Sequence, residues 1–171
     1  MTMAKTAKQV QGDIRRMLRD TYLCSQLSGD VYRNGYRPRD SRKEDVIVSF
    51  TAGTTGQIQK GIVALNIYVP DIDPEANGTW IEDGQRCEEI ERLAQEWVES
   101  LTADRSSYKF ELQQTIYTEA EPDINQHFVV VKLRYQYFGD DDNDPILSSE
   151  DESIVVITPK NQDQEQKQSI I

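Results

Sequence analysis

The sequence predicts an α+β domain in which a four-stranded, mostly antiparallel or mixed sheet carries two amphipathic helices. Two stretches of the chain repeat apolar residues with a helical period, which predicts the helices. Four stretches rich in β-branched and aromatic residues predict the strands, and these occur as two pairs, one before and one after the second helix. A chain of 171 residues is long enough for one such domain with a buried core and a tail.

The first predicted element is a helix over residues 5–27. Val10, Ile14 and Leu18 follow one another at intervals of four, which places them on one stripe of the helix. Glycines and a proline between residues 29 and 38 end the helix and predict a loop. This loop is predicted to be a basic surface, because five cations occur there with little acid to balance them: Arg33, Arg37, Arg39, Arg42 and Lys43.

A β-hairpin is predicted after the basic loop. Residues 46–50 and 57–69 form its two strands, and the glycine-containing stretch 52–56 forms the turn. From Ile62 onward the second strand is apolar on both faces, which is typical of a central strand covered on both sides. Pro70 ends the strand because it lacks the next backbone donor.

A long loop over residues 71–84 separates the hairpin from the second helix. A loop of this length in a compact domain often has a function. Trp80 lies in its polar sequence, and two interpretations of this residue are equally supported. The indole either anchors the loop on the domain or contacts a partner.

The second helix is the clearest prediction, because the apolar residues from Ile90 to Leu101 follow the 3.6-residue period throughout. The helix dipole explains the acidic residues Glu88, Glu89 and Glu91 at its start. Two alternating stretches after the helix, residues 108–116 and 127–138, predict the second pair of strands, with residues 119–125 as their connection.

The charge of the chain is unevenly distributed. The net charge is −11, yet residues 1–43 hold ten basic and four acidic residues, a net charge of +6, and the remaining residues carry −17. Opposite charges at opposite ends suit head-to-tail packing between identical subunits, although solubility alone explains the distribution equally well. A chain this acidic repels nucleic acid, so no specific nucleic-acid partner is expected.

The composition changes at residue 139, which predicts a domain over residues 1–138 and an extension over residues 139–171. The extension begins as an acidic linker and ends in a glutamine-rich tail, which on its own is expected to be disordered. Between them, residues 153–158 predict one short strand that can add to the sheet edge of an adjacent subunit. Its central residues are Ile154, Val155 and Val156.

No stretch of the sequence predicts catalysis, a cofactor or a metal ion. The acidic linker imitates the spacing of a calcium loop, but Pro145 stands where the sharp turn needs glycine. His127 is the only histidine and alternates with residues that face the core. Cys24 and Cys87 are 63 positions apart and read as thiols packed in helices. The chain also lacks an apolar run long enough for a membrane span and a signal-peptide core, so we expect a cytosolic protein that is not an enzyme.

Three stretches of the sequence resemble the phage tail terminator and tail-completion proteins. The first is Leu18-Arg-Asp-Thr-Tyr-Leu-Cys-Ser-Gln-Leu-Ser-Gly-Asp-Val-Tyr-Arg33, with an Arg-Pro pair in the loop that follows. The second is Gln59-Lys-Gly-Ile-Val-Ala-Leu-Asn-Ile-Tyr-Val-Pro70, which is similar to their long central strand. The third is the helical stretch Arg92-Leu-Ala-Gln-Glu-Trp-Val-Glu-Ser-Leu101. The likeness covers about residues 10–138 and depends on the order helix, hairpin, helix, hairpin.

The resemblance implies a structural virion protein: a tail terminator that forms a homo-oligomeric ring, often a hexamer, at the end of the tail tube. Its partners are then other copies of itself, the tail tube protein and the head–tail connector protein, and its place is the virion tail, after assembly in the host cytoplasm. In this hypothesis the five cations of the basic loop contact an adjacent subunit or tube ring, Trp80 contacts a partner, and residues 153–158 pair with an edge strand.

Two alternatives remain open at the level of the sequence. One is a head–tail connector or minor tail protein on a related scaffold, because the long loop and the C-terminal extension depart from the smaller members of the family. The other is a cytosolic binding domain that recognises a basic protein through its acidic C-terminal segment.

Overall fold

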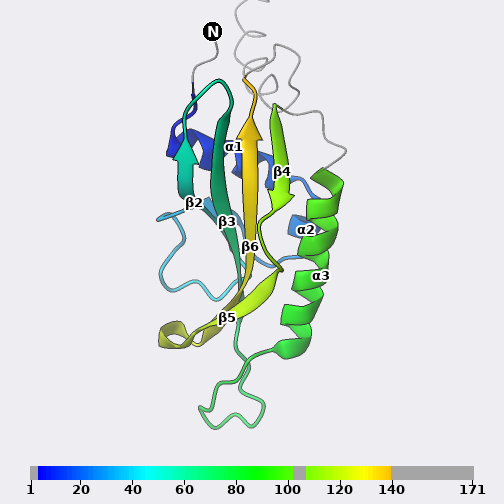
Figure 1. Cartoon of the computed structure of the whole chain (residues 1–171). Coiled ribbons are helices and arrows are strands. Elements are labelled where there is room, and N and C mark those ends of the chain that lie inside the picture. The colour runs from blue at the N-terminus through cyan, green and yellow to red at the C-terminus, as the bar shows by residue number, and fades with distance from the viewer. Residues whose placement is uncertain (1–3, 102–106, 140–171) are drawn as a thin grey trace, which may run out of the picture.

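The computed structural model describes residues 4–101 and 107–139 and has an α+β fold (Figure 1), as the sequence predicts. The predicted count of four strands is wrong, because the described residues form a six-stranded sheet. The helices are α1 (Ala7–Arg19), α2 (Tyr22–Ser25), α3 (Gly84–Ser100) and the short 3₁₀ helix η2 (Pro122–Ile124). The strands are β1 (Val31–Arg33), β2 (Val46–Thr54), β3 (Gln59–Pro70), β4 (Tyr108–Leu112), β5 (Tyr117–Glu121) and β6 (Gln126–Tyr137).

The sheet is mixed, with the order β1-β2-β3-β6-β4. β1 runs parallel to β2, and all the other pairs are antiparallel. The strand β6 pairs with β3 along its whole length, and its other side pairs with β4 in its second half and with β5 in its first. The predicted hairpin is therefore confirmed as β2 and β3. Its turn lies at residues 55–58 rather than 52–56, because β2 continues to Thr54 through a bulge between Phe50 and Ala52.

The two strands that the sequence did not predict, β1 and β5, are short and are held by backbone pairing with a longer neighbouring strand. β1 has three residues, which pair with the start of β2. β5 lies within the stretch that the sequence assigns to a connection. β6 has twelve residues, which is long enough to pair with two five-residue strands, β4 and β5, one after the other along the same side. The predicted strand over residues 108–116 therefore ends at Leu112, and the chain pairs with β6 again from Tyr117 as β5.

The helices cover one face of the sheet. α1 contacts β1 and β2 at one side of this face, and α3 contacts β4, β5 and β6 at the other. The core between the layers includes Val10 and Ile14 of α1, Ile90 of α3 and the inward residues Val63 and Leu65 of β3. The predicted first helix is interrupted at Asp20, because Thr21 caps a separate turn, α2, by accepting from the backbone N–H of Cys24. Within the described residues, no helix has the length and apolar character needed to span a membrane.

The other face of the sheet, here called the open face, has no helix over it among the described residues. In Figure 1 it faces the viewer, and α1 passes behind the strands. Among the described residues, β3 therefore lacks the covering layer that the sequence led us to expect on this side. Its outward residues are shielded by their neighbours instead, as where the rings of Tyr68 and Phe128 lie 5.3 Å apart. The outward residues Ile62, Asn66 and Tyr68 stay partly exposed, whereas the inward ones are buried.

Candidate functional site

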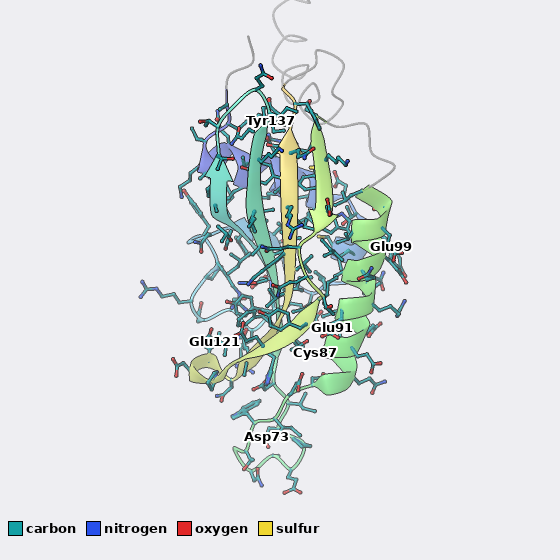
Figure 2. All side chains as sticks on the ribbon, viewed as in Figure 1. Asp73, Cys87, Glu91, Glu99, Glu121 and Tyr137 are labelled. Carbon is teal, nitrogen blue, oxygen red and sulfur yellow. The ribbon has the colours of Figure 1, made fainter. Side chains whose placement is uncertain are left out.

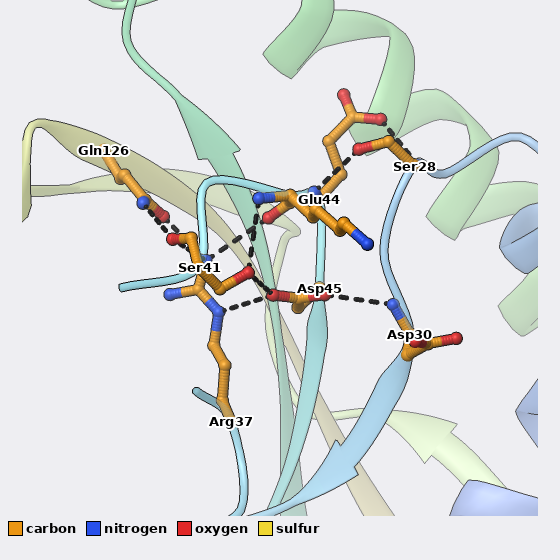
Figure 3. Close-up of polar contacts among 8 residues, drawn as sticks. Ser28, Asp30, Arg37, Ser41, Glu44, Asp45 and Gln126 are labelled. Atoms are coloured by element: carbon orange, nitrogen blue, oxygen red, sulfur yellow. Dashed lines mark hydrogen bonds and ion pairs between the residues drawn. The ribbon is translucent and has the colours of Figure 1, made fainter. Parts of the chain in front are cut away.

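Arg37 of the basic loop lies inside a network of polar contacts (Figure 3). Its Nε donates to Asp45 Oδ2 at 2.9 Å, and one Nη donates to the side-chain oxygen of Gln126 at 2.9 Å. The guanidinium also lies 4.0 Å from the centre of the Tyr68 ring. The Arg37 side chain is 8% exposed and that of Asp45 is 1% exposed. The prediction that Arg37 contacts a neighbouring subunit does not fit this position, since its charge is used within the subunit.

Asp45 is the centre of the network. Besides Arg37, its carboxylate accepts from the Ser41 hydroxyl and from the backbone N–H of Asp30. Burial alone would raise the pKa of Asp45, but these hydrogen bonds and the charge of Arg37 outweigh burial and hold the pKa below its ordinary value. Gln126 also donates to the backbone oxygen of Ser41 at 2.8 Å. The network therefore fixes the basic loop on the ends of β2 and β6.

The other four cations of the basic loop are more accessible than Arg37. Arg33 lies over the ring of Tyr36, with 4.9 Å between guanidinium and ring centre, and Lys8 of α1 lies over the same ring at 5.4 Å. Arg42 reaches the carbonyl of Ile124 at 3.3 Å. Arg39 and Lys43 are exposed. We call five cations the basic flank, since within the described residues none has a carboxylate in ion-pairing range: Lys8, Arg33, Arg39, Arg42 and Lys43.

The long loop after β3 projects from one end of the sheet (Figure 1). Ile72 and Ile81 form a two-way backbone bridge at its base, with both N–H to O distances 2.9 Å. Asp73, labelled within the loop in Figure 2, accepts from the backbone N–H groups of Asn77 and Gly78 at 3.1 and 2.8 Å. Gly78 has a φ of 83°, which glycine adopts without a steric penalty. These hydrogen bonds give the loop a defined conformation, and we call it the projection.

Trp80 belongs to an exposed apolar patch on this projection. Its ring centre lies 5.0 Å from the Arg42 guanidinium, so the projection and the basic loop meet. Trp80 remains 42% exposed, and the neighbouring Ile72 and Ile81 are similarly accessible. The indole thus contacts the domain through Arg42, and its exposed surface leaves contact with a partner as a prediction. We call Ile72, Trp80 and Ile81 the loop patch.

The outer side of α3 carries the opposite charge. The helix begins at Gly84 with Asp83 as its cap and has no acidic residue in its first turn, so the helix dipole does not explain the acidic residues that follow. Two arginines partly balance them: Arg86 pairs with Glu89 and also with Glu44 of the basic loop, and Arg92 pairs with Glu96. Glu99 marks this side in Figure 2, whereas Glu91 faces β5 and accepts from the Thr118 hydroxyl at 2.8 Å. We call the five carboxylates the acidic flank: Glu88, Glu89, Glu91, Glu96 and Glu99.

Two further polar clusters lie within the domain. His127 Nδ1 is 2.6 Å from Asp71 Oδ1 at the end of β3, and the Tyr108 hydroxyl donates to Asp13 Oδ2 at 2.5 Å beneath α1. Burial, together with the Asp13 carboxylate, raises the pKa of Tyr108. Cys87 is buried and Cys24 is partly buried against the core, and burial raises the pKa of the Cys87 thiol to about 12. A thiol with so high a pKa is a poor nucleophile at neutral pH.

Comparison with known proteins adds no assignment. No protein-family model matches this chain, and no curated protein is significantly similar to it. The described residues also contain no group of histidine, cysteine and carboxylate side chains arranged to hold a metal ion.

The structure brings together some of the predicted site residues. Arg37 and Arg42 lie in the same loop, and Arg42 meets Trp80, but Arg37 is internal. Sequence reasoning missed Lys8, which belongs to the basic flank, and Tyr36, whose ring lies under both Lys8 and Arg33. No local signal links these two residues, because they are 28 positions apart in the chain. Ile154, Val155 and Val156, and the calcium-like spacing before them, lie outside the described residues.

Proposed function

We propose that this protein is a subunit of a closed homo-oligomeric ring, and that the ring is a phage tail terminator, with six subunits as the expected number. In this role it ends the tail tube and offers a surface to the head–tail connector. It is a structural protein of the virion tail and performs no catalysis.

The separation of the two flanks carries this proposal. α1 and the basic loop lie beside β1 and β2, at one side of the sheet, and α3 lies beside β4, β5 and β6 at the other. The two sides meet where Glu44 of the basic loop pairs with Arg86 at the start of α3. Away from that contact, five cations with no ion pair among the described residues lie on a different side of the sheet from a helix with five carboxylates and two arginines. A heterologous ring contact joins two different surfaces of the same protein, and surfaces of opposite charge favour that contact while like surfaces repel.

The loop patch supports a second contact outside the ring interface. The projection extends beyond one end of the sheet (Figure 1) and meets the basic flank where Trp80 contacts Arg42. Aromatic and aliphatic side chains next to an arginine are typical of the centre of a protein interface. We therefore assign Trp80 to contact with a tail partner, either the tube or the connector.

The test is the mass of the full-length protein, measured by light scattering after size exclusion at low and high salt. We expect a closed oligomer whose mass falls as salt rises, because salt screens exposed charges. The variant R39E/K43E is expected to remain monomeric at low salt. Adding E88K and E96K to that variant places two lysines on the acidic flank, where they can pair with the two new glutamates, and is expected to restore part of the oligomer.

The matched control is K60E/K109E, which reverses two exposed cations on the open face, outside both flanks, and is expected to keep the parent mass. An oligomer that R39E/K43E leaves intact would show that the flanks do not form the interface. A monomer under all conditions that captures a basic protein through its acidic C-terminal segment would instead support the binding-domain alternative.

A further inference from the structure

A groove of about 310 Å³ crosses one end of the open face. It spans β2, β3, β6 and β4, at the end of the sheet that holds the turn between β2 and β3. Its lining is mostly apolar and includes the small residues Ala52, Gly53 and Gly61 beside Ile62. The groove lies on the opposite side of the sheet from the core and at the opposite end from the loop patch.

The rim of the groove is cationic. Lys60, Lys109 and Arg134 line it together with a single carboxylate, Glu111, which lies 4.0 Å from Arg134. Both members of that pair are well exposed, so the pair neutralises little of the local charge in water. Such a groove can bind a peptide segment that has a block of apolar residues, which contact the floor, next to a block of acidic residues, which face the cationic rim.

Exposed apolar surface continues from the groove to the point where the chain leaves the described structure. Lys60 pairs with Gln136 on the open face, and Ile58 and Phe138 lie two positions from these residues, just beyond the ends of β3 and β6. Ile58 is 40% exposed and Phe138 is 51% exposed. The described residues end at Gly139, next to this surface.

The sequence that follows has the complementary chemistry. Seven carboxylates and no basic residue occur between positions 140 and 152, and the apolar run Ile154-Val-Val-Ile157 comes directly after them. The run begins about 14 residues beyond Gly139, and an extended chain of that length reaches roughly 45–50 Å. A tether of this kind holds the segment at an effective concentration in the millimolar range relative to a groove on its own subunit.

We propose that the groove is the docking site of residues 153–158 of the same chain, with the acidic residues before them facing the cationic rim. This differs from the addition of a strand to a neighbour's sheet edge, which the sequence suggests. It also does not depend on the ring: the tether makes the contact intramolecular, so it forms in a monomer as well as in an oligomer.

The test uses the full-length protein with the photo-cross-linking residue p-benzoylphenylalanine in place of Val155. After irradiation, mass spectrometry of the monomer band identifies the peptides joined to position 155. We expect cross-links to the segments that hold Ala52 to Ile62, Lys109 and Arg134. The same photo-cross-linker in place of Gln164 is expected to give a yield several-fold lower at these segments.

Charge-reversal variants distinguish specific docking of residues 153–158 in the groove from cross-linking that results only from the tether holding this segment nearby. K60E/K109E changes the rim and is expected to lower the cross-linking yield at the groove several-fold, while R39E/K43E at the other end of the sheet leaves it unchanged. In the ring test R39E/K43E is the test variant and K60E/K109E is the control, whereas here K60E/K109E is the test variant and R39E/K43E is the control. The ring proposal and the docking proposal can therefore fail independently of each other. Cross-links to another surface, between two copies, or at a yield unaffected by K60E/K109E would overturn the proposal.

Discussion

Arg37 shows how little a single side chain in a sequence says about its role. By composition it belongs with Arg39 and Arg42, and all three were predicted as surface contacts. The structure separates them, because Arg37 alone lies within reach of the buried carboxylate of Asp45. That carboxylate is eight positions later in the chain, at the start of β2, and only the path of the loop brings the two together. Arg37 therefore holds the basic loop in place.

Replacing Arg37 with alanine should strongly destabilise the fold. The change leaves Asp45 buried without its cation, and removing one partner of a buried ion pair typically costs about 3–5 kcal/mol. R39A removes an exposed arginine from the same loop and should change the free energy of unfolding by no more than about 0.5 kcal/mol. Urea unfolding of both variants measures the difference. Equal losses would mean that Arg37 is not the anchor of the loop.

Asp45 should make stability depend on acid. Its pKa is lower in the folded protein than in the unfolded chain, so the folded state binds fewer protons at low pH. The resulting stabilisation is complete above the unfolded pKa of about 4 and is lost as the pH falls from there through the folded value. D45N should therefore be less stable at neutral pH and lose less of its remaining stability on acidification. Urea midpoints at neutral and acidic pH test this, with exposed D40N as the control that keeps the parent slope.

At the scale of the elements, the turn end of the hairpin depends on a close approach between β3 and β6. Gly61 pairs with Tyr135, and a Cβ at this glycine would lie 2.4 Å from the Ala52 carbonyl oxygen and 2.5 Å from a Tyr135 ring carbon. These distances are shorter than any normal contact. Tyr135 is 1% exposed and cannot swing away without opening the core.

G61A should accordingly lower the free energy of unfolding by about 1–3 kcal/mol, the usual cost of forcing extra volume into a packed site. G56A is the matched control in the turn, because the nearest atom to its added Cβ is 3.8 Å away. Thermal and urea unfolding of the two variants make the comparison. A G61A variant as stable as G56A would show that the strands can separate at no cost.

The elements that could be predicted are those whose own residues carry the signal. The stripe of Val10, Ile14 and Leu18 fixes α1, and the period from Ile90 onward fixes α3, because each helix has one apolar face that must be buried. β1 and β5 lack such a signal. β1 has only three residues, and β5 is the polar stretch Tyr117–Glu121. Each becomes a strand only because the backbone of a neighbouring strand, β2 or β6, pairs with it.

At the scale of the whole molecule, the sequence showed that the two ends of the chain differ in charge, but it did not show where these charges lie in the folded protein. Folding turns much of this difference along the chain into one across the sheet, since α1 packs mainly on β1 and β2 and α3 on β4, β5 and β6, although Glu44 of the basic loop still reaches Arg86 of α3. The explanation of Glu88, Glu89 and Glu91 by the helix dipole is wrong, because the start of α3 lies four residues before Glu88. The open face and its groove were not predicted, since whether a layer covers a strand is a property of the assembled fold.

The position of β6 has a consequence for how the protein folds during synthesis. β6 is the last described strand in the chain and pairs with β3, β4 and β5. Until residues 126–137 have left the ribosome, those three strands have exposed edges, and the hairpin of β2 and β3 presents apolar residues with no sheet to complete. Long-range pairing of this kind slows folding, and exposed strand edges favour aggregation. The nascent chain is thus most vulnerable just before β6 emerges, which makes ribosomal pausing or premature termination ahead of this strand more harmful here than in a protein whose central strand comes first.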